Sequence, residues 1–279
     1  MQDSFESYQQ FKGIEIAKNE NELDENLEFL KRDGYFIVTN FFSDLELITI
    51  RKKMDQAWED QKNKYGEELL KKIGDWGQIR GMMLEDEIFS NLIIHPSILK
   101  YVDATIGDTA ILHLQNGIVL HPSEKHNQAK YHKDFPKDFI SSKILSFNAF
   151  IAVDEFNADN GGTWILPGSH KFAEMPSQAY IKKNQIQIKC PAGSVIFFDS
   201  TLWHKGGDNY TKNVRRAINQ QYSRPFIKQQ LDYPVMMKGK VDMESKLAQK
   251  LGMWTIPPKG VDEYRVNDPK LRTYRGGQG

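Results

Sequence analysis

Residues 131–136 read Tyr131-His132-Lys133-Asp134-Phe135-Pro136, a strand-like stretch with a histidine and an aspartate two residues apart. On a β-strand, side chains at positions i and i+2 point to the same face, so His132 and Asp134 are expected to project together into one cavity. On a helix this spacing would separate them, because helical neighbours lie about three or four residues apart. A converging imidazole and carboxylate supply two of the three ligands of a two-histidine, one-carboxylate metal site. The stretch therefore predicts a metal centre, provided that the chain supplies a second histidine.

The composition excludes several classes of function. The 279 residues carry 37 basic and 37 acidic side chains, so nothing in the charge predicts a nucleic acid or an anionic membrane as a partner. No apolar run approaches the roughly 20 residues that span a bilayer, and the N-terminus lacks the pattern of a signal peptide. Cys190 is the single cysteine, which excludes an intrachain disulfide. These features predict a cytoplasmic protein and leave the oligomeric state open.

The predicted secondary structure changes twice along the chain, and we expect one domain over residues 1–279. A helical part spans about 22–107, where Ser43-Asp44-Leu45-Glu46 has the form of a capping box. A β-core spans about 109–224, where apolar and β-branched runs alternate with Gly- and Asn-rich turns. A helical and irregular extension follows over about 225–279. Closely spaced strands predict a sandwich or jelly roll, so the expected class is mainly β with flanking N- and C-terminal helices. The expected strands include 111–120, 129–135, 143–153, 163–166, 185–189, 194–198 and 214–222.

Among the seven histidines, His204 stands out by its position as a candidate for the second ligand of the metal centre. It follows the apolar strand 194–198 and precedes the turn 206–209, a position from which a side chain can reach the mouth of a barrel. His121 and His126 lie in a polar loop and form an alternative site with His132. The remaining three of the seven histidines, His95, His113 and His170, are expected to be structural or exposed.

Two adjacent arginines lie on the strand that returns from this turn. An arginine inside a β-barrel is unfavourable unless it meets an anion, and its planar fork suits a carboxylate. Strand alternation turns one of Arg215 and Arg216 inward and the other outward. Alternation alone does not decide between them.

In their order along the chain, these motifs resemble the phytanoyl-CoA dioxygenase family of Fe(II)/2-oxoglutarate oxygenases. An H-x-D pair alone is a weak signal, but the ordered set is a strong one, and the resemblance covers roughly residues 25–225. It rests on Arg32-Asp33-Gly34-Tyr35-Phe36-Ile37-Val38, Tyr131 to Pro136, Asn160-Gly161-Gly162-Thr163-Trp164-Ile165-Leu166-Pro167-Gly168-Ser169-His170, Ala192-Gly193-Ser194-Val195-Ile196-Phe197-Phe198-Asp199, His204 and Arg215-Arg216-Ala217-Ile218.

The resemblance implies a double-stranded β-helix, also called a cupin-like jelly roll, and a site that uses Fe(II), 2-oxoglutarate and O2. It implies metal ligands at His132, Asp134 and His204. It also favours Arg215 as the anchor of the distal 2-oxoglutarate carboxylate, because the spacing of eleven residues from His204 is typical of the family. Three further residues are expected to contact the cosubstrate: Gln115, Asn148 and Phe150.

The implied activity is hydroxylation of a small molecule with release of succinate and CO2, and the carboxylate at Asp134 points away from halogenation. Alternatives are a non-catalytic jelly-roll protein that binds a metal or ligand, and the same iron chemistry used for desaturation or epimerisation. A cupin-like sugar isomerase is disfavoured because such sites usually carry more histidines. Residues 74–85, with Trp76, Arg80, Met82 and Met83, and the region around Trp254 are expected to act as lids. Phe135 and Trp164 are expected to line the substrate pocket.

Overall fold

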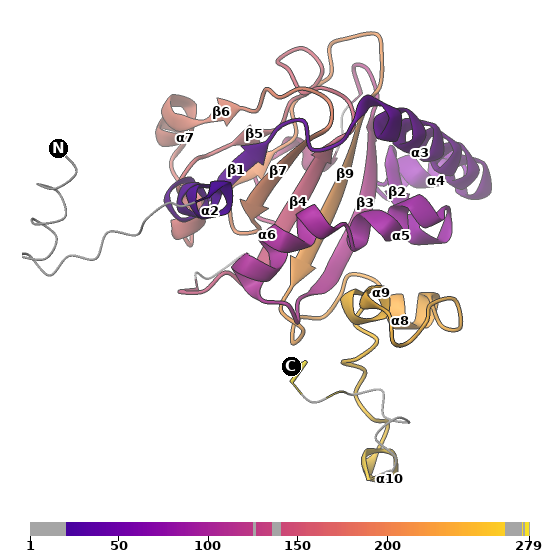
Figure 1. Cartoon of the computed structure of the whole chain (residues 1–279). Helices are drawn as coiled ribbons and strands as arrows, with labels where there is room; N and C mark the ends of the chain where they lie inside the picture. Colours follow the sequence, from indigo (N-terminus) through magenta and orange to yellow (C-terminus); the bar gives the residue numbers. More distant parts are fainter. Residues whose placement is uncertain (1–20, 125–126, 136–140, 266–274, 276, 279) are drawn as a thin grey trace, which may run out of the picture.

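The computed structural model describes residues 21–124, 127–135, 141–265, 275 and 277–278. These residues form a mixed α/β structure with two antiparallel sheets (Figure 1). The larger sheet has the order β1-β7-β4-β9-β3-β2, and the smaller has the order β6-β5-β8. The strands of the larger sheet are β1 (Tyr35–Val38), β2 (Gln78–Arg80), β3 (Ile111–Leu120), β4 (Ser146–Ala152), β7 (Ser194–Asp199) and β9 (Arg215–Ser223); those of the smaller are β5 (Trp164–Ile165), β6 (Ile186–Gln187) and β8 (His204–Lys205).

Strand β4 shows why the larger sheet is buried on both faces. All seven of its residues are buried, as expected for a strand covered on both sides. Phe147, Ala149 and Ile151 belong to the core beneath the helices, whereas Phe150 and Ala152 belong to a second core beside the smaller sheet. Alternation along the strand therefore divides the molecule into a helix-covered face and a site-bearing face.

Helices from the first part of the chain cover one face of the larger sheet, and α5 and α6 cross it in Figure 1. Helix α3 begins at the expected capping box: the Ser43 backbone N–H donates to Glu46 Oε2 at 2.8 Å, and the Glu46 N–H donates to Ser43 Oγ at 3.4 Å. The helices of this part are α2 (Glu22–Asp33), α3 (Asp44–Tyr65), α4 (Glu67–Lys72), α5 (Glu87–Ile93) and α6 (Pro96–Ile106), with the short 3₁₀ turn η1 (Met82–Leu84).

The described C-terminal part contains short helices joined by irregular segments. Helix α9 (Lys246–Lys250) packs against β3 and α5. No helix in the described ranges is long and apolar enough to cross a membrane. The remaining elements are α7 (Gln178–Asn184), α8 (Tyr233–Met236), α10 (Val261–Tyr264), η2 (Asn127–Ala129) and η3 (Ser169–Lys171).

Two local predictions are wrong. The expected strand 129–135 reduces to one bridge between His132 and His204, because the N–H groups of Asp134 and Phe135 both donate to the Ser200 carbonyl and interrupt a regular ladder. The expected lid 74–85 is partly core, because residues 78–80 form the edge strand β2, paired with β3. Met82 and Met83 are buried in the helix-covered core.

His95 gives the fold a pH-dependent element. It packs against Phe41 and Phe42, with both ring centroids 5.4 Å away, and burial lowers the pKa of its imidazole despite the opposing influence of Glu46. The unfolded state therefore takes up this proton first as the pH falls, and the free energy of unfolding decreases below the ordinary histidine pKa.

We expect the stability of the ligand-free protein to fall less steeply from pH 7.5 to 5.5 in His95→Gln than in the wild type. For one proton, the difference in slope is at most about 1.4 kcal/mol per pH unit. Urea unfolding at several pH values measures it. Parallel curves for the two proteins would contradict the assignment, even if the variant is less stable throughout.

Candidate active site

Backbone pairing brings the three expected metal ligands together. His132 and His204 exchange backbone hydrogen bonds of 2.9 and 3.0 Å, and the Asp134 N–H donates to the Ser200 carbonyl at 2.9 Å. The H-x-D segment is thus held against the chain that runs from β7 into β8. This pairing places ligands 72 residues apart in sequence side by side.

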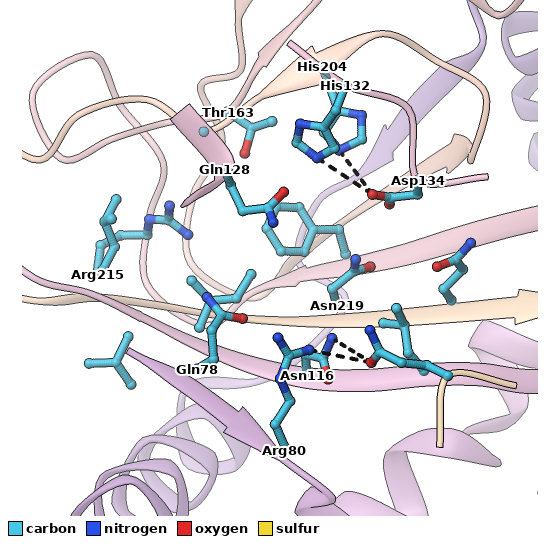
Figure 2. A pocket seen from close by; sticks show the side chains of 18 of the residues that line it. Gln78, Arg80, Asn116, Gln128, His132, Asp134, Thr163, His204, Arg215 and Asn219 are labelled. Atoms are coloured by element: carbon cyan, nitrogen blue, oxygen red, sulfur yellow. Dashed lines mark hydrogen bonds and ion pairs between the residues drawn. The ribbon is translucent and has the colours of Figure 1, made fainter. Parts of the chain in front are cut away.

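The three side chains converge on one point. His132 Nε2 and His204 Nε2 lie 3.6 and 3.7 Å from Asp134 Oδ1, and all three ligand atoms lie within 4.8 Å of one another. Figure 2 shows the two imidazoles facing the carboxylate across this point. In the part of the chain that the structure describes, this is the one group of three or more His, Cys, Asp or Glu side chains with such geometry. The His126 alternative lies outside the described residues.

Both imidazoles direct an unprotonated Nε2 toward the point where a metal would bind. His132 Nδ1 lies 2.8 Å from the Lys130 carbonyl oxygen, and His204 Nδ1 lies 2.9 Å from that of Leu202. A carbonyl accepts only, so each Nδ1 carries the proton and donates it, which leaves each Nε2 lone pair directed toward Asp134. Histidine ligands are commonly oriented in this way. The donor set fits a divalent iron site.

A buried hydrogen-bond network holds the other oxygen of Asp134. Asn148 Nδ2 donates to Asp134 Oδ2 and to Asn219 Oδ1, both at 2.9 Å. Ser200 Oγ donates to Asn148 Oδ1 in turn. Asn148 and Ser200 are fully buried. The outer carboxylate oxygen is therefore fixed, and Oδ1 faces the ligand point.

Arg215 lies to one side of the ligand group (Figure 2). It is 3 % exposed, and burial lowers the pKa of its guanidinium to about 10, so it remains charged near neutral pH. Its Nη2 donates to the Gly161 carbonyl at 3.1 Å, and its Cζ lies 4.3 Å from the centroid of the Phe156 ring. Nε and Nη1 have no hydrogen-bond partner among the described residues. A buried guanidinium with two unused donors is a site for an anion.

Its neighbour Arg216 faces the other way. Arg216 makes ion pairs with Asp55 at 2.7 Å and with Asp154 at 3.0 Å. The structure thus turns Arg215 to the interior and Arg216 outward, in the arrangement that the histidine-to-arginine spacing favoured.

One cavity of about 310 Å³ extends from the ligand group, the side chains of His132, Asp134 and His204, to Arg215. Phe150 lines it, whereas Asn148 lies behind Asp134. Trp76 and Arg80, from the expected lid, also line it.

Gln115 is not at the site. Its side chain points to the helix-covered face, where Nε2 donates to the Phe89 carbonyl and to Gln220, both at 2.8 Å. Because neighbours on a strand face opposite sides, Asn116 lines the cavity instead. Trp254 lies in the C-terminal part, against Arg275. Phe135 lies near His113, with ring centroids 6.2 Å apart, whereas Trp164 is not among the side chains that line the cavity.

Sequence reasoning missed most of the polar wall of this cavity. Asn219 and Gln221 share the face of Arg215, so alternation from Arg215 would have found them. The others depend on pairing between distant segments and had no local signal. These missed residues are Gln78, Asn116, Gln128 and Gln230; His113, expected to be structural, and His121, expected only as an alternative metal ligand, also line the cavity.

Comparison with known proteins agrees with this geometry. The model of the family described as Phytanoyl-CoA dioxygenase (PhyH) matches residues 30–217. The uncharacterized protein Rv1501 of Mycobacterium tuberculosis is 36% identical over 270 residues, which cover 94% of this chain and 98% of that protein. The ectoine dioxygenase of Bordetella bronchiseptica is 22% identical over 231 residues, covering 71% and 74%.

The fold also matches a solved structure, that of the epimerase SnoN in complex with Fe3+, alpha ketoglutarate and nogalamycin RO. The TM-score is 0.56, the identity is 17%, and the match covers 72% of this chain and 83% of that one. Fold, ligand group and comparisons define the class, the Fe/2-oxoglutarate dioxygenase superfamily. Within it, the chain belongs to the phytanoyl-CoA dioxygenase family.

Proposed function

We propose that this protein is an Fe(II)- and 2-oxoglutarate-dependent oxygenase that hydroxylates a small molecule with release of succinate and CO2. The observation that carries the proposal is the pairing of the ligand group with Arg215 in one cavity, since the two sites match the two ends of the cosubstrate. His132, Asp134 and His204 would hold the metal, with His132 and His204 binding through Nε2. When bound, Fe(II) with 2-oxoglutarate supplies O2 activation, coupled to cosubstrate decarboxylation and oxidation of a substrate C–H bond.

In this proposal, the protein's own groups bind and orient the reactants. The guanidinium of Arg215, whose Nε and Nη1 have no partner among the described residues, would pair with the distal carboxylate of 2-oxoglutarate. Phe150 and Phe198 line the cavity near the ligands and exclude water from the reacting centre. Asn148 holds Asp134 in position, in place of the direct cosubstrate contact expected from the sequence.

We also propose that the fold is a double-stranded β-helix. The two facing antiparallel sheets correspond to a double-stranded β-helix with the site between them. The chain acts as one domain, 1–279, because the C-terminal helix α9 packs on β3. Desaturation and epimerisation would use the same groups.

Anaerobic addition of Fe(II) and 2-oxoglutarate should produce a weak visible charge-transfer band in the wild type, because the cosubstrate chelates an iron that has three protein ligands. His132→Ala should lack the band. Under air, the wild type should form succinate above the level of this variant. If the iron-loaded wild type gives no band, the proposal fails. If the band forms but succinate stays at the variant's level, the non-catalytic binding protein is the better description.

A further inference from the structure

The wall of the cavity away from Arg215 is rich in side-chain amides. Across the cavity from the ligand group, Figure 2 shows Arg80, Gln78 and Asn116 on β2 and β3. These strands pair directly, with Arg80 opposite Asn116. In all, six carboxamide side chains line the cavity: Gln78, Asn116, Gln128, Asn219, Gln221 and Gln230.

The cations near this wall are already neutralised. Arg80 Nη2 and Nε donate to the two carboxylate oxygens of Asp75 at 2.6 and 3.2 Å. Lys71 lies 2.7 Å from Glu67 and 3.5 Å from Glu124, a cavity residue. Among the residues that the structure describes, the wall therefore offers no unpaired cation for a carboxylate or a phosphate.

The remaining charged or titratable side chains of the cavity do not change this balance. Lys133 directs its ammonium to the carbonyls of Phe172 and Ala173, at 2.6 and 3.2 Å. Burial lowers the pKa of His113 and of His121, so both rings are neutral near pH 7. Arg215 is reserved for the cosubstrate in the proposed function.

The carboxamides retain hydrogen-bonding capacity. Asn116 Oδ1 is buried without a partner within the described part of the chain, and Gln78 lines the cavity beside it. Gln230 Oε1 accepts only long bonds of 3.4 Å from Arg80 Nη1 and Asn116 Nδ2. Amides both donate and accept, as hydroxyl groups do. A ligand with several hydroxyl groups satisfies such a wall.

The size of the cavity limits the ligand further. At about 310 Å³, it is at the small end of ligand sites, which span about 300–1,000 Å³. The cosubstrate occupies part of it. The space that remains suits one small ring.

We propose that the substrate is a small, uncharged, hydroxyl-rich molecule, such as a sugar ring or a cyclitol, bound by Gln78, Asn116 and Gln230. This inference rests on the proposed function, because it assigns the Arg215 end of the cavity to 2-oxoglutarate. A wall of neutral carboxamides differs from a site for acyl-CoA thioesters or other anions, which would need unpaired cations.

Probes that share one ring and differ in charge test the proposal. Glucose, myo-inositol, glucuronate and glucose 6-phosphate are titrated by saturation-transfer NMR into the full chain loaded with Zn(II) and 2-oxoglutarate, which cannot turn over. We expect the neutral probes to bind at least about fivefold more tightly than the anions. The carboxylate or phosphate of an anionic probe would meet no unpaired cation among the described residues of the wall. Tighter binding of either anion, or no binding of either neutral probe, overturns the proposal.

Asp75→Asn provides a second test, because it frees the guanidinium of Arg80. We expect glucuronate affinity to rise by about fivefold in this variant, with glucose affinity unchanged. Glu67→Gln is the matched control, since Lys71 lies outside the cavity lining and keeps its second partner, Glu124, so the variant should leave glucuronate binding unchanged. A glucuronate affinity that is the same in Asp75→Asn as in the wild type contradicts the role given to the Asp75–Arg80 pair.

Calorimetric titration of 2-oxoglutarate into the same Zn(II)-loaded samples separates two kinds of failure. If 2-oxoglutarate does not bind, the proposed function itself fails. If it binds while neither neutral probe does, only the inference about the substrate fails.

Discussion

Replacing Arg215 with glutamine is expected to weaken 2-oxoglutarate binding by about 100-fold or more, as for other buried charge pairs that lose one partner. The guanidinium is 3 % exposed and retains two donors without partners among the described residues. A glutamine at this position keeps some polarity but supplies neither the charge nor the fork. Calorimetric titration of 2-oxoglutarate into the Zn(II)-loaded protein measures the effect.

The same substitution should alter the stability of the ligand-free protein by less than about 1 kcal/mol. It removes the hydrogen bond to Gly161 and the contact with Phe156, but it also removes a buried cation with no carboxylate partner, and these effects oppose each other. Stability and cosubstrate binding are thus separated in this variant. Urea unfolding measures the first independently of the second.

Arg216→Gln is the matched control. Arg216 is paired with Asp55 and Asp154 on the outer side of the same strand, so its loss should lower the free energy of unfolding by about 2 kcal/mol and leave 2-oxoglutarate affinity unchanged. If the two variants weaken 2-oxoglutarate binding equally, Arg215 is not the specific anchor.

These two arginines also show how far the sequence determines the site. Alternation predicts that one faces inward, and only the family spacing selects Arg215. The structure supplies the physical reason, because Asp55 on α3 and Asp154 after β4 draw Arg216 outward. Neither partner is near it in sequence. A rule that considers one strand at a time cannot include them.

Most strands of the β-core, such as β3 and β7, could be predicted because the sequence pattern of a strand is local. The polar residues that line the cavity could not be predicted in this way, because their positions depend on which strands pair. Gln78 and Arg80 enter the cavity because β2 pairs with residues 116–118 of β3. The β3–β9 register shifts between residues 112 and 114, so simple alternation along β3 does not extend across this point. The error at Gln115 and the missed Asn116 are two results of assigning a face without the register.

Asn148→Leu is expected to lower metal affinity by about 10- to 100-fold, the usual range for losing a residue that orients a ligand. Leucine has nearly the same shape, but it cannot donate to Asp134 Oδ2 or accept from Ser200. The Asp134 carboxylate is then free to rotate. Anaerobic Co(II) titration measures the affinity, and the visible spectrum of the bound Co(II) should change with it, which a purely structural defect would not produce.

Gln115→Leu separates this effect from a general loss of buried hydrogen bonds. Gln115 and Asn148 are both fully buried carboxamides with two bonds from Nε2 or Nδ2. Each substitution should lower the free energy of unfolding by about 2–3 kcal/mol, but only Asn148 contacts a ligand side chain. Co(II) affinity and spectrum should therefore remain as in the wild type in Gln115→Leu. Equal losses of affinity in the two variants would mean that core stability sets metal binding, and that Asn148 has no positioning role.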